Sequence, residues 1–128
     1  MMSKRYALIV DDNADVRDII SLTLNRFGFD VGTAGDGTEA LKSIEERVPD
    51  LLLLDLMMPN KNGFHVLHQL REAPDTRKIP VIVISSVSDE SMLNIPGVRG
   101  VLPKTQFSVK DLKALIDEIF EKIEQGAD

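Results

Sequence analysis

Residues 51–59 read LLLLDLMMP, a short unbroken apolar run that ends in Asp55 and is followed by a proline. A second run, residues 7–10, reads ALIV and ends in the pair Asp11 and Asp12. Buried parallel strands have this pattern, and ligands of open α/β sheets bind at the carboxyl ends of such strands. We therefore expect the three carboxylates to share one pocket.

The chemistry of such a pocket favours a bound cation. Carboxylates that lie close together raise one another's pKa unless a positive charge lies among them. Carboxylate oxygens are the ligands that hard ions such as Mg²⁺ prefer. The sequence therefore predicts an acidic metal site in which one carboxylate is left to react.

The composition limits the class of protein. The 128 residues include no cysteine, and the first residues lack the apolar stretch of a signal peptide. The longest apolar runs are too short to span a membrane. A net charge of −6 and the lack of a basic stripe argue against direct binding of nucleic acid. We expect a cytoplasmic protein of one domain, residues 1–128, that contacts neither DNA nor a membrane.

Between the two runs, apolar residues recur at helical spacing. The pattern predicts helices over residues 14–27, 38–48, 64–70 and 109–123, and further strands over residues 29–33, 81–84 and 101–102. Strands that alternate with helices form a parallel sheet with right-handed crossovers, so we expect an α/β fold. The predicted apolar faces are Val16, Ile19, Ile20, Leu24 and Phe27 in the first helix, and Val109, Leu112, Leu115, Ile116, Ile119, Phe120 and Ile123 in the last. In the third helix the apolar residues are Phe64, Leu67 and Leu70.

The segment between the fourth and fifth strands is unusual. Ser88 can cap a helix that begins at Asp89, but Pro96 and Gly97 cannot continue it. A helix of about two turns with few apolar residues buries little surface. We therefore expect the fourth helix to be short, frayed or absent, and its amides to be less protected from hydrogen exchange than those of the last helix.

These residues together resemble the receiver domain of two-component response regulators, the CheY-like family, over nearly the whole chain. The resemblance depends on an acidic pair after the first strand, an Asp after the third strand with Pro four and Gly eight residues later, a hydroxyl residue after the fourth strand and a Lys after the fifth. In this sequence the residues are Asp11 and Asp12, Asp55 with Pro59 and Gly63, Ser85, and Lys104. The resemblance implies a flavodoxin-like (βα)5 three-layer sandwich with strand order 2-1-3-4-5.

The resemblance also implies a mechanism. Asp55 would accept a phosphoryl group from a phosphohistidine on a histidine kinase or a phosphotransfer protein. Mg²⁺ would be held by Asp12, Asp55 and the backbone carbonyl of Met57, with Asp11 acting through a water, and Ser85 and Lys104 would bind the phosphoryl oxygens. The phosphorylated domain would then switch its contacts with a downstream effector protein or domain, as a monomer or weak homodimer. It would not be an enzyme beyond its own phosphorylation and dephosphorylation.

Two positions depart from the pattern of that family. Thr105 follows Lys104 where the family usually has a proline joined by a cis peptide bond. A cis bond before a non-proline residue costs about 2.5–4 kcal/mol, so we expect a trans bond. Val101 occupies a position that is often aromatic and rotates inward on activation. The alternative is therefore a degenerate receiver that acts as a phosphorylation-independent protein-interaction module.

Two other functions would use some of the same residues. Gly35, Gly37 and Ala40 match a loose dinucleotide-binding fingerprint, but that fingerprint should follow the first strand of its unit, and here it follows the second. A phosphatase of the haloacid dehalogenase type requires two aspartates separated by one residue, a spacing that neither Asp11 nor Asp55 provides. We reject both functions and interpret Met57 and Met58 as residues of the core or of the wall of the site.

Overall fold

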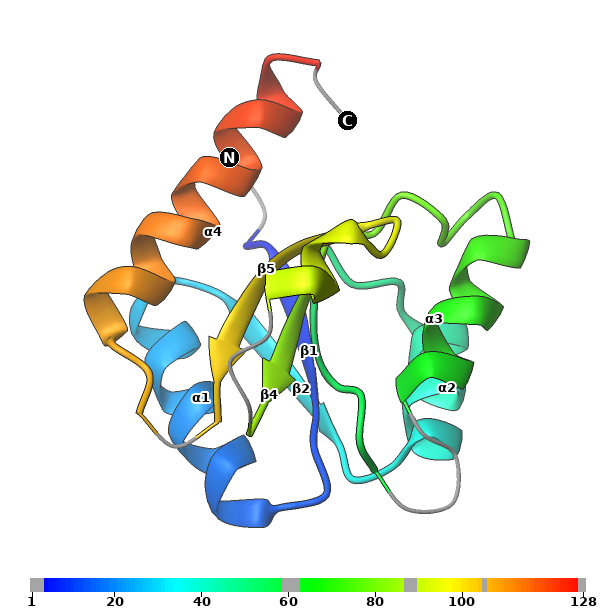
Figure 1. The fold of residues 1–128 in the computed structure, drawn as a ribbon, viewed down its shortest axis with the longest axis horizontal. Coiled ribbons are helices and arrows are strands. Elements are labelled where there is room, and N and C mark those ends of the chain that lie inside the picture. The colour runs from blue at the N-terminus through cyan, green and yellow to red at the C-terminus, as the bar shows by residue number, and fades with distance from the viewer. Residues whose placement is uncertain (1–3, 59–62, 87–89, 105, 127–128) are drawn as a thin grey trace.

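A computed structural model describes residues 4–58, 63–86, 90–104 and 106–126. Five strands form one parallel sheet in the order β2-β1-β3-β4-β5, as expected for a flavodoxin-like fold (Figure 1). The strands are β1 (Tyr6–Val10), β2 (Asp30–Ala34), β3 (Leu51–Asp55), β4 (Val81–Ser85) and β5 (Val98–Pro103). Because every strand runs in the same direction, all five carboxyl ends lie along the lower edge of the sheet in Figure 1.

Helices cover both faces of this sheet. They are α1 (Ala14–Arg26), α2 (Gly37–Glu46), α3 (Gly63–Glu72) and α4 (Val109–Glu124), and a 3-10 helix, η1 (Glu90–Asn94), lies between β4 and β5. Helices α1 and α4 pack on one face, and α2 and α3 pack on the other (Figure 1). The side chains of Asn13, Asp36 and Ser108 cap the amino termini of α1, α2 and α4.

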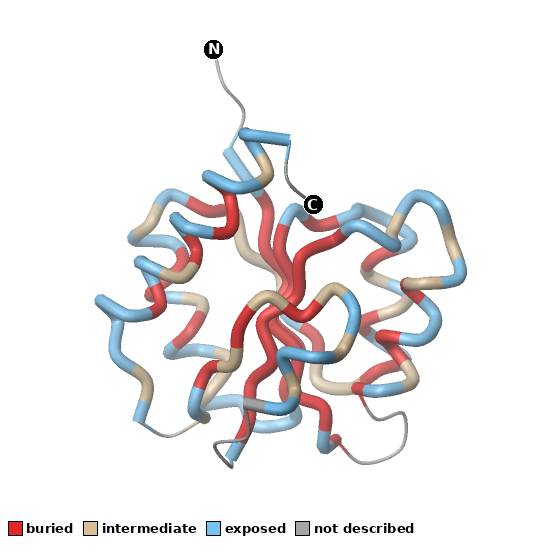
Figure 2. The backbone as a smooth tube through the Cα atoms, turned by 45° about the horizontal axis from the view of Figure 1, so that its top comes forward, coloured by how far each residue is buried: buried red, intermediate tan, exposed pale blue. Residues whose placement is uncertain are grey.

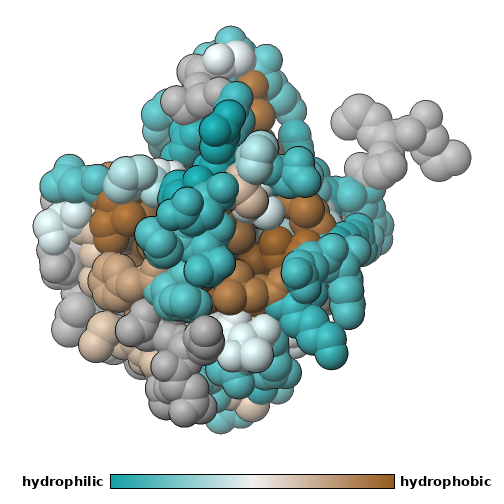
Figure 3. All heavy atoms as spheres, turned by 90° about the vertical axis from the view of Figure 1, so that its right-hand side faces the viewer, coloured by the Kyte–Doolittle hydropathy of each residue, from teal (hydrophilic) through white to brown (hydrophobic). Residues whose placement is uncertain are grey.

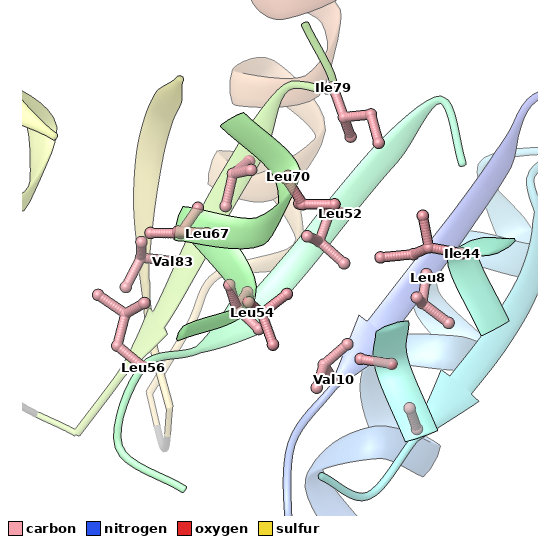
Figure 4. Packing of buried hydrophobic residues seen from close by; sticks show 14 of the residues in the cluster. Leu8, Val10, Ile44, Leu52, Leu54, Leu56, Leu67, Leu70, Ile79 and Val83 are labelled. Atoms are coloured by element: carbon pink, nitrogen blue, oxygen red, sulfur yellow. The ribbon is translucent and has the colours of Figure 1, made fainter. Parts of the chain in front are cut away.

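The sheet separates two hydrophobic clusters. In β1, Leu8 and Val10 belong to the cluster under α2 and α3, whereas Ala7 and Ile9 belong to the cluster under α1 and α4. This alternation follows from the two-residue period of a strand, and both sides are apolar because helices cover both faces. Figure 2 shows β1, β3 and β4 as the buried middle of the sheet, and Figure 4 shows Ile44 of α2 and Leu70 of α3 packed over β1 and β3.

Several predicted positions are wrong in detail. Ile19 is 56% exposed and Val109 is 53% exposed, so neither belongs to the apolar face of its helix. Phe64 is also exposed, at the start of α3. Helical spacing places a residue on a side of the helix, but the width of the buried stripe depends on which elements pack against it.

Strand β5 is longer than the two residues predicted. It begins at Val98 because Val98 pairs with Val81, and Gly100 pairs with Ile82, so Arg99 is an extra residue in the ladder. An Arg and a Gly within the strand hide its alternation from a sequence pattern. A Cβ at Gly100 would collide with the side chain of Leu115 in α4, so glycine here allows that helix to approach the sheet.

The prediction of a short fourth helix is confirmed, since η1 has five residues. Met92 and Ile95 pack against the hydrophobic cluster under α2 and α3, while Leu93 is 47% exposed. The predicted cap Ser88 lies outside the described residues. Arg71 of α3 holds the end of this segment: its Nε and Nη2 donate to the carbonyl oxygen of Pro96 at 3.0 and 2.7 Å.

The face formed by α2 and α3 contains a groove. Figure 3 shows hydrophobic surface between bands of hydrophilic surface on this side of the molecule. The groove has a volume of about 770 Å³, and its lining includes Leu41, Ile44 and Leu70. Among the described segments, none of the helices is both long enough and apolar enough to cross a membrane.

Candidate functional site

The three predicted acidic residues lie together at the carboxyl edge of the sheet. Val10 of β1 pairs with Leu54 of β3, so Asp11 and Asp55 follow neighbouring positions of adjacent strands. One carboxylate oxygen from each of Asp11, Asp12 and Asp55 lies within 4.8 Å of the others. The expectation that the acids share one pocket is therefore correct.

Lys104 completes this group, which we call the acidic pocket: Asp11, Asp12, Asp55 and Lys104. The Nζ atom of Lys104 lies 3.0 Å from Oδ2 of Asp55, 3.2 Å from Oδ1 of Asp11 and 3.6 Å from Oδ1 of Asp12. Lys104 starts beyond the end of β5 and reaches past β4 to the acids at the ends of β1 and β3. Its backbone N–H donates to the Ser85 carbonyl at 2.7 Å, which fixes the start of the side chain. The amine reaches Asp55 although Thr105 follows it; the peptide bond to Thr105 lies outside the described residues.

Ser85 is positioned by the register of β4. Ile84 pairs with Asp55, and Ser85 pairs with Pro103, so the serine lies at the same edge as the acidic pocket. The residue is buried. The strand therefore places a hydroxyl residue between the ends of β3 and β5, where the sequence predicts it.

Backbone N–H groups hold one oxygen of each of the two buried acids. Asn13 donates to Oδ1 of Asp11 at 2.9 Å, and Met57 donates to Oδ1 of Asp55 at 2.9 Å. The Oδ2 atom of Asp11 is buried and has no hydrogen-bond partner among the described residues. A buried carboxylate oxygen without a partner is costly, so this atom marks a place for a cation or a water.

The two methionines after β3 differ. Met58 is buried, as expected of a core residue, but Met57 is 77% exposed, so its interpretation as a core or wall residue is wrong. The Met57 N–H turns toward Asp55, and its side chain turns to solvent. The apolar pattern of β3 ends at Asp55, so the sequence has no periodicity from which to predict whether the residues after Asp55 are buried or exposed.

Gly63 is required by close packing beneath Asp55. Its N–H donates to the Leu56 carbonyl at 3.2 Å. A Cβ at this position would collide with the carbonyl oxygen of Asp55 and would lie 2.5 Å from the Leu56 Cα. The first turn of α3 thus rests against the backbone that carries Asp55, while Pro59 lies outside the described residues.

The electrostatics of the pocket are unbalanced, with three carboxylates around one ammonium. Burial raises the pKa of Asp11, and the hydrogen bonds from Asn13 and Lys104 oppose that rise only in part. Burial alone would lower the pKa of Lys104, but its hydrogen bonds to Asp55 and Asp11 and the charges of these acids outweigh burial, so the pKa is raised. The ammonium of Lys104 therefore stays charged at neutral pH.

The family-level comparison agrees with this geometry. Residues 7–117 match the family model described as the response regulator receiver domain. The chain belongs to the response regulator receiver family. The prediction from the acidic pair, Asp55 and Lys104 is confirmed at this level.

Curated relatives of this receiver are longer proteins. It is 35% identical over 126 residues to a protein of Porphyridium aerugineum described as a probable transcriptional regulator, ycf27, covering 98% of this chain and 52% of that protein. It is 39% identical over 86 residues to the DNA-binding response regulator MtrA of Mycobacterium tuberculosis (strain ATCC 25618 / H37Rv), covering 67% of this chain and 36% of that protein. The chain spans about half the length of the first of these relatives and about a third of the second.

Solved receivers share the fold. The chemotaxis protein CheY4 of Vibrio cholerae superposes with a TM-score of 0.81 at 25% identity, covering 91% of this chain and 98% of that one. The N-terminal domain of a response regulator receiver protein from Methanoculleus marisnigri has a TM-score of 0.74 at 28% identity, covering 96% of both chains.

One residue near the site was not predicted from the sequence. Arg17 of α1 donates from Nη1 to the backbone carbonyl of Asp11 at 2.7 Å. An Arg in the second turn of a helix normally faces solvent. Only the fold shows that this one turns back over the loop that carries the acidic pair.

Proposed function

We propose that this domain accepts a phosphoryl group on Asp55 from a phosphohistidine on a histidine kinase or histidine phosphotransfer protein. The observation that carries the proposal is the contact of Lys104 Nζ with Asp55 Oδ2 at 3.0 Å, inside a pocket of three carboxylates. An isolated aspartate at a strand end needs no such partner. A buried aspartate beside a lysine is suited to phosphorylation, because the ammonium offsets the negative charge that the phosphoryl group adds.

The residues of the pocket fit Mg²⁺. The three acids offer oxygen ligands, and Oδ2 of Asp11 is buried with no hydrogen-bond partner in the described part of the chain. Asp12, Asp55 and the Met57 carbonyl would hold the ion, with Asp11 acting through a water. When bound, the ion supplies positive charge that neutralises phosphoryl oxygens.

The residues of the chain have separate tasks in this proposal. An oxygen of Asp55 forms the new bond to phosphorus while the bond from phosphorus to the histidine nitrogen of the donor breaks, and the histidine keeps that electron pair. Lys104 pairs with a phosphoryl oxygen, and the Ser85 hydroxyl donates a hydrogen bond to another. The hydrogen bond from Met57 orients the Asp55 carboxylate before the reaction.

The consequence for the domain is a change of charge at one edge of the sheet. The phosphoryl group adds negative charge at Asp55, and the side chains of Lys104 and Ser85 can move toward it. Ser85 is the last residue of β4, and Lys104 directly follows β5. We propose that this rearrangement switches contacts with a downstream effector protein or domain. The domain would not be an enzyme beyond its own phosphorylation and dephosphorylation, and would act in the cytoplasm as a monomer or weak homodimer.

The relatives named as a transcriptional regulator and a DNA-binding response regulator suggest an output on DNA. This chain has a net charge of −6 and spans only part of those proteins. We propose that any contact with DNA is made by another domain or partner, because a surface of this charge repels phosphates.

The test is incubation with acetyl phosphate and Mg²⁺, followed by mass measurement of the intact protein. The wild type should gain one phosphoryl group, and Asp55→Asn should gain none while keeping its fold by circular dichroism. Asp18→Asn, which changes an exposed aspartate of α1, is the matched control and should behave as the wild type. Uptake by Asp55→Asn would refute the assignment of Asp55. No uptake by the folded wild type would instead favour a phosphorylation-independent interaction module.

A further inference from the structure

The backbone of the Asp11–Asn13 loop is held from three sides. The N–H of Asp11 donates to the Ala34 carbonyl of β2 at 3.2 Å, and Oδ1 of Asp11 accepts from the N–H of Asn13. The carbonyl oxygen of Asp11 accepts from Nη1 of Arg17 at 2.7 Å. The first two bonds come from the strand ladder and from the loop itself. The third bond is donated by the guanidinium of Arg17, which keeps its positive charge at any ordinary pH.

The bond from Arg17 fixes the direction of Asp12. The peptide unit between Asp11 and Asp12 is planar, so holding the Asp11 carbonyl also sets the orientation of the Asp12 N–H and Cα. Asp12 needs such support because its side chain is 41% exposed and its carboxylate approaches Lys104 only at 3.6 Å. Asp11 and Asp55, in contrast, are buried and hydrogen-bonded through their own carboxylates.

We propose that Arg17 is a positioning residue for the acidic pocket, which holds the Asp11 carbonyl so that Asp12 is ready to bind Mg²⁺. This inference rests on the proposed function of the domain. Arg17 places its guanidinium against the backbone of the acidic pair, because it donates to the carbonyl oxygen of Asp11. Lys104 has the opposite arrangement, since its ammonium contacts the carboxylates directly.

The neighbouring loop leaves room for this contact. A Cβ at Gly35 would lie 3.4 Å from Nη1 of Arg17 and 3.1 Å from Oε2 of Glu39. Glu39 already accepts a hydrogen bond from the Gly35 N–H at 3.0 Å. The guanidinium of Arg17 therefore lies next to Gly35, where a side chain at position 35 would contact it.

The experiment compares four proteins with the wild type. Arg17→Met keeps most of the aliphatic side chain but loses the charge and the N–H groups that donate to the Asp11 carbonyl. Arg17→Gln also loses the charge, and its side chain is too short to reach that carbonyl. Arg17→Lys keeps the charge and one donor. Arg26→Met is the matched control, since Arg26 lies exposed in the last turn of the same helix. For each protein, Mg²⁺ affinity is measured by calorimetry on the unphosphorylated form, Tm is measured without Mg²⁺, and the phosphorylation rate is measured with acetyl phosphate.

Removing a group that orients metal ligands typically costs about 10–100-fold in affinity or activity, so Arg17→Met and Arg17→Gln should bind Mg²⁺ at least about tenfold more weakly than the control. Arg17→Lys should recover part of this loss. The loss should exceed what the change in Tm explains, because a merely structural arginine would lower stability without lowering the affinity of the folded protein. The phosphorylation rate at saturating Mg²⁺ should fall less than the rate at low Mg²⁺.

The inference would be overturned if Arg17→Met bound Mg²⁺ with an affinity within about twofold of that of Arg26→Met. A difference of that size lies near the error of the comparison. If the Met variant does not fold, the Gln variant is judged by the same criterion. A wild type that takes up no phosphoryl group would refute the proposed function instead. Phosphorylation of the wild type together with unchanged Arg17 variants would refute only the role of Arg17.

Discussion

The three aspartates of the acidic pocket have the same chemistry but different surroundings. Asp11 is fully buried, and one of its oxygens has no partner within the described segments. Asp55 is buried and paired with Lys104, and Asp12 is exposed. The most buried acid has the highest desolvation cost and the least freedom to move. This makes Asp11 suited to stabilising a cation, whereas Asp55, held on both oxygens by Met57 and Lys104, is oriented for reaction.

At this scale we predict that Asp11→Asn stabilises the metal-free protein at pH 7, because the amide carries no charge that burial would penalise. Burial raises the pKa of Asp11 above its ordinary value of 3.8, so the ionised form is disfavoured in the folded state. The stability of the wild type therefore falls as the pH rises from about 4 through the pKa that Asp11 has in the folded protein. Urea unfolding without Mg²⁺ at pH 7 and below pH 4 measures the difference.

The gain should therefore be absent below pH 4, where Asp11 is protonated in both the folded and unfolded states. Asp18→Asn serves as the control, because that carboxylate is exposed and should change stability little. A destabilised Asp11→Asn protein at pH 7 would show that the hydrogen bond to Lys104 outweighs burial, contrary to this prediction.

Among the elements, η1 is the part of the fold that differs most from a regular helix. Five residues of 3-10 helix contribute only Met92 to the hydrophobic cluster, with Ile95 following. Arg71 compensates for this small buried surface. It connects α3 to the carbonyl of Pro96 by two hydrogen bonds and to the carbonyl of Arg77 by a third at 2.7 Å.

We predict that Arg71→Met releases this segment. Two exposed carbonyl oxygens exchange their donors for water, which should lower the free energy of unfolding by about 1 kcal/mol. Hydrogen exchange of the amides of Ile95 and Val98 should accelerate well beyond the change in global stability, while Ile116 of α4 should follow global stability alone.

Arg77→Met is the matched control for this prediction. The side chain of Arg77 is exposed, and only its backbone carbonyl contacts Arg71. Equal exchange of Ile95 and Val98 in the two variants would mean that packing of Met92 and Ile95, and not Arg71, holds the segment. In the wild type, η1 is still expected to exchange faster than α4.

At the scale of the molecule, the two ends of the described chain lie opposite the acidic pocket. Arg5, before β1, pairs with Glu124 at the end of α4 at 2.7 Å and stacks over the ring of Phe120 at 4.1 Å. Figure 1 shows the end of α4 at the top of the view, whereas the strand ends that carry the acids lie at the lower edge of the sheet. Charge added at Asp55 must therefore act through the sheet and its helices if it is to affect that end.

The final prediction concerns the stability of the whole domain in Mg²⁺. An ion that binds only the folded state adds about 1.4 kcal/mol when its concentration is roughly ten times its dissociation constant. Thermal melts should show this gain for the wild type and almost none for Asp12→Ala. Glu45→Ala removes an exposed acid of α2 and should keep the full gain. Equal stabilisation of Asp12→Ala and wild type by Mg²⁺ would exclude Asp12 as a ligand.

The sequence by itself determined the sheet and the edge at which the acids lie. Unbroken apolar runs end at Asp11 and Asp55, and a buried strand must place the residue that follows it at the sheet edge. Alternation of these runs with amphipathic segments predicted a parallel sheet, whereas the strand order was implied by the resemblance to the receiver family. Pro96 and Gly97 likewise limited η1, because neither residue continues a helix.

Only the tertiary structure decided which side chains meet. Lys104 reaches Asp55 across β4, Arg17 turns back to the Asp11 carbonyl, and Arg71 joins α3 to the turn before β5. It also left Ile19 and Met57 exposed, against their apolar character. The physical reason is that local patterns record the preferences of a segment for helix, strand and burial, whereas the reach of a long side chain depends on the positions of elements distant in the sequence.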